Sequence, residues 1–164
     1  MKKHTPETVS RERQLLALLC RALDDKKAGD LRVIEVAGLS SITDYLVIAT
    51  GLAEPHLRAM RIAAEQVLDA NGVKIAGMDT NQQSGWLVVD AYQIMLHFFT
   101  ASAREKYALE QLWRDGREIP LAEVLNLEAA PAKAKAAAKA TVPRKRAAPA
   151  ARPRTKTRAK AKKG

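Results

Sequence analysis

The chain has 164 residues, 47% of them hydrophobic, which is enough for one domain with a hydrophobic core. The net charge of +10 is uneven: residues 1–128 hold 15 of the 28 basic residues and all 18 acidic ones, whereas residues 129–164 hold 13 basic residues and no acid. No apolar run approaches the ~20 residues of a membrane span, which argues against a membrane-spanning helix.

The first residues of the chain and its cysteine content indicate the cellular compartment. The segment MKKHTPETVSRER lacks the apolar stretch of a signal peptide, and its two glutamates argue against an organelle transit peptide. The single cysteine, Cys20, cannot form an internal disulfide and lies among leucines at helical spacing, which predicts an inert core thiol. We therefore expect a soluble, cytoplasmic protein.

The first third of the chain predicts a helix and two strands. Thr5 followed by Pro6 is typical of a helix N-terminus, and the leucines that follow form one helical stripe before Gly29. Residues 31–37 and 45–50 are rich in β-branched side chains, so both are predicted strands. The second has no polar alternation, which indicates a central strand covered on both faces.

The next part predicts a helix followed by three strands. Helical spacing returns over residues 55–71, and a short strand is predicted at residues 73–77. A polar loop over residues 79–85 then leads to two further strands, residues 86–90 and 94–99.

The last predicted element of the domain is a helix from Ser102 to Arg114, followed by a further turn of helix within residues 120–125. The expected core contacts of the long helix are Leu109, Leu112 and Trp113. The order α, β, β, α, β, β, β, α indicates an α+β domain over residues 1–127, with a single mixed β-sheet packed with helices.

Residues 128–164 have a different composition. They consist almost entirely of Ala, Lys, Arg and Pro, with one valine beyond residue 130. Like charges and scattered prolines cannot build a core, so this segment is predicted to be a disordered basic C-terminal tail.

Patterns for catalysis and metal binding are weak. The sequence has no G-x-S-x-G elbow and no phosphate loop of the Walker type. His4, His56 and His97 are far apart and lack metal-ligand spacing, while Asp44 and Asp90 each stand alone. We therefore predict a protein that is not an enzyme and needs no metal or cofactor.

The most conspicuous side chains lie between residues 86 and 107. A two-residue turn at Ala91 and Tyr92 would place Trp86 directly opposite His97. Strand alternation adds to that face Val88, Asp90 and Met95. Arg104 and Tyr107, at i and i+3 of the next helix, would add an edge to it. A surface of this composition suits protein docking.

Several of these residues also have an ordinary structural explanation. Trp86 would by default be a core tryptophan, His97 a buried and hydrogen-bonded histidine, and Asp44 a cap for the turn before a strand. Their combination on one face is what favours a docking site over an active site.

Segments of the chain match one known family in order and spacing. They are SSITDYLVIATG, His56, GWLVVD, His97 and REKYALEQLW. Over about residues 10–120 the chain resembles the ribosomal silencing factor family, known as RsfS or the Iojap-like family. The resemblance implies a nucleotidyltransferase-like topology, but the G-S and D-x-D elements that bind nucleotide and metal in such enzymes are missing here.

The resemblance also implies a partner and a mechanism. Members of this family bind the large ribosomal subunit through its universal protein numbered fourteen, near the face that receives the small subunit. They thereby prevent subunit joining and lower translation when nutrients are scarce. By motif match, the docking or supporting residues are Trp86, Asp90, His97, Arg104 and Tyr107, with Met95 on the same face. Residues expected to shape a strand end and turn are Asp44, Thr50 and Gly51.

Two positions depart from the usual family pattern. Glu54-Pro55-His56 stands where Ser-Arg-His is common, which removes a basic residue, and Asp79-Thr80 stands where Glu-Gly is common. Neither change touches the proposed face.

Three functions remain compatible with the residues. The leading one is a non-catalytic factor that blocks ribosomal subunit association. The alternatives are a nucleic-acid-binding protein that acts through its basic tail, and a diverged nucleotidyltransferase. The sequence leaves open whether the free protein is a monomer or a homodimer.

Removing residues 128–164 should weaken ribosome attachment through rRNA without changing where the protein binds. Each lysine or arginine that displaces counterions from a phosphate contributes a salt slope of roughly 0.7 to 0.9. If about a third to a half of the 13 basic residues engage, the full-length slope of log affinity against log salt should be steeper by roughly 3 to 6. Salt titrations of large-subunit binding measure both slopes; matching slopes would mean that the tail does not contact rRNA.

Overall fold

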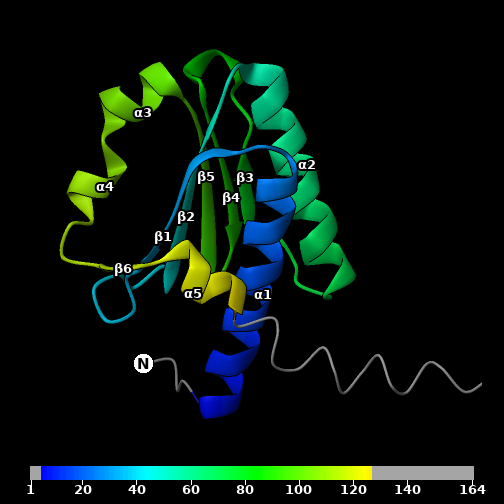
Figure 1. Cartoon of the computed structure of the whole chain (residues 1–164), viewed down its shortest axis with the longest axis vertical. Coiled ribbons are helices and arrows are strands. Elements are labelled where there is room, and N and C mark those ends of the chain that lie inside the picture. The colour runs from blue at the N-terminus through cyan, green and yellow to red at the C-terminus, as the bar shows by residue number, and fades with distance from the viewer. Residues whose placement is uncertain (1–4, 127–164) are drawn as a thin grey trace, which may run out of the picture.

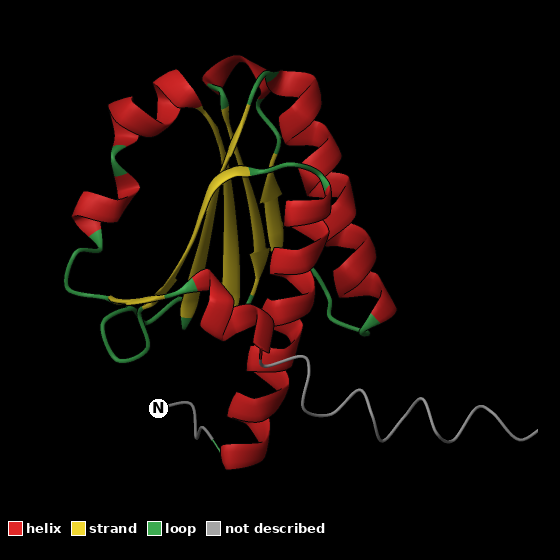
Figure 2. Ribbon diagram, viewed as in Figure 1, coloured by secondary structure: helices red, strands yellow, loops and turns green. Residues whose placement is uncertain are grey.

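The computed structural model describes residues 5–126, which form a single β-sheet with helices on both faces (Figures 1 and 2). The elements in chain order are α1 (Pro6–Asp25), β1 (Gly29–Glu35), β2 (Tyr45–Gly51), α2 (Glu54–Ala70), β3 (Gly77–Asp79), η1 (Gln82–Ser84), β4 (Trp86–Ala91), β5 (Ile94–Thr100), α3 (Ala101–Tyr107), α4 (Leu109–Leu112), β6 (Arg117–Ile119) and α5 (Leu121–Asn126). The predicted disordered tail lies outside the described residues.

The sheet is mixed, as predicted. Its six strands have the order β3-β4-β5-β2-β1-β6, in which β2 and β5 are parallel and the other neighbours are antiparallel. Strand β2 lies in the interior of the sheet and all of its residues except Thr50 are buried. The predicted α+β class and the central position of this strand are therefore confirmed.

The two faces of the sheet are covered unequally. Helices α1, α2 and α5 cover one face, where they enclose the larger hydrophobic core (Figure 1). On the other face, α3 and α4 have only seven and four residues and pack over a smaller cluster that includes Ile48, Phe99 and Leu109. Trp86 and Met95 therefore remain only partly buried at the edge of this second cluster.

Helix α1 follows its sequence signals closely. The Thr5 hydroxyl accepts a hydrogen bond from the N–H of Thr8 at 3.3 Å and Pro6 occupies the first turn, as expected of an N-cap. Cys20 is completely buried, and burial raises the pKa of its thiol to about 12. The prediction of an inert core thiol is confirmed.

The strand predicted at residues 73–77 was placed too early. The observed strand is β3, whose residues pair with Val88 to Asp90 of β4. Val73 and Ile75 instead pack against the larger core. Their apolar character therefore reflects core packing and not sheet pairing. Strand β3 includes Asp79, which had been assigned to the following loop.

The helix predicted from Ser102 to Arg114 was wrong as a single element. Ala108 adopts a left-handed conformation with φ 43°, so the chain forms α3 and α4 in succession. Leu109 is buried as predicted, but Leu112 is 72% exposed and makes no core contact of the kind expected. Strand β6 was not predicted, because three residues carry little periodicity and are defined by their pairing with β1.

Candidate functional site

The hairpin that joins β4 to β5 turns at Tyr92 and Gln93, one residue later than predicted. Ala91 and Ile94 form the last pair of the ladder. Tyr92 has a φ of 63°, in the left-handed region that tight hairpin turns require, and its N–H donates to Asp90 Oδ1 at 2.9 Å. The Asp90 carboxylate thus stabilises the turn that sets the register of the two strands.

This register pairs Trp86 with Phe99 and His97 with Val88. The predicted direct pairing of Trp86 with His97 is therefore wrong. Both side chains still lie on one face, because the register differs by two residues and strand alternation is preserved. Diagonally across the two strands, Trp86 Nε1 donates a hydrogen bond to His97 Nδ1 at 3.2 Å.

Four rings form a continuous cluster, here called the aromatic face: Trp86, His97, Phe99 and Tyr107. The Trp86 ring centroid lies 5.1 Å from that of Phe99, 4.8 Å from that of Tyr107 and 5.8 Å from that of His97. Phe99 and His97 are buried beneath, whereas Trp86 is half-buried and Tyr107 is 41% exposed. Sequence reasoning missed Phe99, although its spacing of two from His97 marks the same face.

His97 supports Trp86 as a neutral hydrogen-bond acceptor. Because Nδ1 accepts from the indole, the ring proton lies on Nε2, which is buried without a hydrogen-bond partner in the described part of the chain. Burial lowers the pKa of His97 to about 4. At neutral pH the imidazole is therefore uncharged and cannot lose its acceptor role by protonation.

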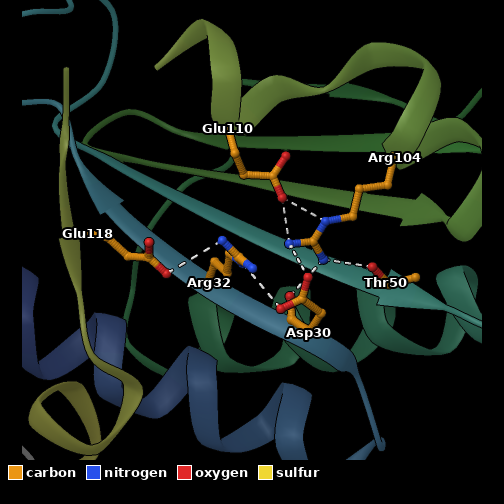
Figure 3. A network of polar contacts seen from close by, with 6 residues as sticks. All are labelled: Asp30, Arg32, Thr50, Arg104, Glu110 and Glu118. Atoms are coloured by element: carbon orange, nitrogen blue, oxygen red, sulfur yellow. Dashed lines mark hydrogen bonds and ion pairs between the residues drawn. The ribbon is translucent and has the colours of Figure 1, made fainter. Parts of the chain in front are cut away.

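The Arg104 guanidinium lies in a polar network at the start of β1 and the end of β2 (Figure 3). Its Nη1 donates to the Asp30 carbonyl oxygen and to Thr50 Oγ1, both at 2.6 Å. Its Nε donates to Glu110 Oε1 at 2.7 Å, and Nη2 lies 3.1 Å from Asp30 Oδ2. The guanidinium is thus surrounded by partners from three other elements, and the residue is only 9% exposed.

The network around Arg104 joins the second helical layer to the sheet. Arg104 belongs to α3 and Glu110 to α4, so their ion pair holds the two short helices together across the break at Ala108. Tyr107 follows Arg104 by three residues and reaches the Trp86 ring. Arg104 therefore fixes the helix that places Tyr107 on the aromatic face.

The remaining predicted residues are Met95, Asp44 and Gly51. Met95 lies partly buried beside the aromatic face. Asp44 is buried, and its N–H donates to the Gln93 carbonyl oxygen at 3.0 Å. A Cβ at Gly51 would lie 2.6 Å from Leu57 Cδ2, so a glycine here allows α2 to approach the end of β2. Within residues 5–126, no three His, Cys, Asp or Glu side chains gather as a metal site would require.

The sequence model of one protein family, described as "ribosomal silencing factor during starvation", matches residues 9–151. The chain belongs to this family. It is 29% identical over 113 residues to the ribosomal silencing factor RsfS of Bacillus subtilis, covering 69% of this chain and 93% of that protein. As a member of the ribosomal silencing factor family, it is a ribosome-associated regulator of translation.

Two further comparisons extend the family relationship. A mouse protein named "mitochondrial assembly of ribosomal large subunit protein 1" is 34% identical over 102 residues, which cover 58% of this chain and 43% of that protein. A crystal structure of a Chromobacterium violaceum protein is similar with a TM-score of 0.59 and 26% identity, covering 65% of this chain and 88% of that chain. No helix in the described residues is long and apolar enough to cross a membrane.

Replacing Arg104 by methionine should destabilise the domain much more than the same change at Arg32. Both arginines contact Asp30, but Arg104 is nearly buried whereas the Arg32 side chain is 41% exposed. Loss of Arg104 removes several charge-assisted hydrogen bonds from a nearly buried site, each contributing about 1.5 to 3 kcal/mol, whereas an exposed ion pair contributes less than about 1 kcal/mol. Urea unfolding measures the unfolding free energy of both variants. Equal losses of unfolding free energy would contradict a structural role specific to Arg104.

The pH dependence of stability should report the burial of His97. The unfolded chain takes up a proton at this residue below pH about 6.5, while the folded chain does so only near pH 4, so stability falls as pH decreases through that window. Between pH 7 and pH 4, wild type should lose about 3 kcal/mol more unfolding free energy than His97→Asn. Urea titrations at each pH give the unfolding free energy of both proteins. If it changes with pH equally in the two, His97 has the same pKa in the folded and unfolded chains.

Proposed function

We propose that the chain binds the large ribosomal subunit through its aromatic face and prevents joining of the small subunit by occupying the contact surface. The partner is the universal large-subunit protein numbered fourteen. Membership of the silencing factor family supports a ribosomal partner, and the name of the mouse relative refers to the large subunit. The observation that carries the proposal for this chain is the half-buried Trp86, held in place by its contacts with His97, Phe99 and Tyr107.

The geometry of Trp86 suits a binding anchor. A large aromatic side chain that is already fixed by neighbours loses little conformational entropy on binding. Its remaining exposed surface lies beside the exposed ring of Tyr107, so a partner can cover both at once. Tryptophan and tyrosine are enriched among residues that contribute most to interface affinity.

The same side chains are poorly arranged for catalysis. A general base needs an accessible lone pair and a pKa near the working pH. The Nδ1 lone pair of His97 is engaged by Trp86, and the pKa of the ring is about 4. Asp90 uses a carboxylate oxygen to stabilise the hairpin turn. The proposed activity is therefore steric, and it needs affinity and bulk but no reaction.

Trp86→Ala should weaken binding to isolated large subunits by more than ~1 kcal/mol, that is, at least about fivefold in Kd. Leu112→Ala is the matched control, because Leu112 is 72% exposed and lies outside the aromatic face. Co-sedimentation gives the affinities, and light scattering of mixed subunits gives the loss of anti-association activity.

The unfolding free energy of Trp86→Ala must be measured alongside its affinity. A tryptophan that served only the core would cost ~3 to 5 kcal/mol of stability on truncation. A folded Trp86→Ala protein that binds large subunits as wild type does would rule out Trp86 as the anchor.

A further inference from the structure

A cavity of about 310 Å³ opens between α2 and the strands β3 and β4, next to the aromatic face. Its lining includes Leu57, Arg58, Arg61, Met78, Trp86 and Leu87. Trp86 belongs to both surfaces, since it also contacts the rings of the aromatic face. A partner that covers Trp86 would therefore lie at the mouth of this cavity.

The cavity has an apolar interior. Leu57 and Leu87 are 1% and 5% exposed and form its buried part, while Met78 is 40% exposed at its edge. A volume at the lower end of the range for ligand pockets is sufficient for one large apolar side chain. The interior thus suits an aliphatic or aromatic group and offers little to a fully polar one.

The rim of the cavity carries two arginines in different states. Arg61 forms an ion pair with Glu65 one turn further along α2, and its Nη1 lies 3.4 Å from Met78 Sδ. Arg58 is exposed and makes no ion pair or side-chain hydrogen bond within residues 5–126. Glu54 also lines the cavity, so Arg58 is the cation of the rim that is left for an anionic group of a partner.

We propose that this cavity is a second binding subsite, which takes an apolar side chain of the ribosomal protein partner and pairs a neighbouring carboxylate with Arg58. The inference rests on the proposed function, because it assumes that a protein partner covers Trp86. An RNA partner fits less well. Binding of a nucleic-acid backbone uses a series of cations, whereas this cavity has one unpaired arginine, and the Glu54 carboxylate in its lining would repel phosphates.

Charge reversal tests the ionic half of the proposal in the full-length protein. Arg58→Glu should raise the Kd for large subunits by about tenfold, because it replaces attraction by repulsion at the interface. Lys74→Glu is the matched control, since Lys74 is exposed and outside the lining of the cavity. Equal affinities of the two variants would overturn the subsite. Equal melting temperatures of the variants exclude unfolding as the cause of a difference.

Photo-crosslinking identifies the occupant. A p-benzoylphenylalanine residue in place of Thr80, which lines the cavity, should give an adduct with a large-subunit protein. An adduct with rRNA alone, or no adduct from bound protein, would overturn the proposal. The Trp86→Ala variant distinguishes failure of the subsite from failure of the docking face. If Trp86→Ala loses binding to large subunits while Arg58→Glu binds as well as Lys74→Glu, the subsite proposal is wrong and the docking-face proposal stands.

Discussion

The buried guanidinium of Arg104 is the interaction on which the second helical layer depends. It bonds the carbonyl of Asp30, the hydroxyl of Thr50 and the carboxylate of Glu110, and so connects α3 and α4 to β1 and β2. Helices of seven and four residues are too short to be stable by themselves. Their position over the sheet is therefore set by this network and by the small hydrophobic cluster beneath them.

The shortness of this layer creates the candidate site. Long helices bury the opposite face of the sheet, but α3 and α4 leave the β4 and β5 side chains at their edge partly open. Trp86 lies at this edge, hydrogen-bonded to a neutral His97 and in contact with Tyr107 from α3. The result is an aromatic surface whose partly exposed rings are held in place by their neighbours, and whose histidine is uncharged at neutral pH.

The parts of the fold that were predictable are those with local or periodic signals. Helix α1 has a cap and a leucine stripe, and strand alternation placed Trp86 and His97 on one face even though their register was wrong. The helix break was not predictable, because Ala108 has high helix propensity and its left-handed conformation has no local signal in the sequence. The polar network around Arg104 buries this residue, which had been predicted at the edge of this face, while Tyr107 of the same helix contacts the Trp86 ring.

Hydroxyl-radical footprinting of the chain bound to isolated large subunits tests the role of the aromatic face most directly. The account predicts that oxidation of Trp86 and Tyr107 falls on addition of large subunits and is unchanged by small subunits. Tyr92, 49% exposed at the other end of the hairpin, provides an internal reference. The account would be contradicted if the chain binds large subunits while Trp86 and Tyr107 are oxidised as fast as in the unbound protein.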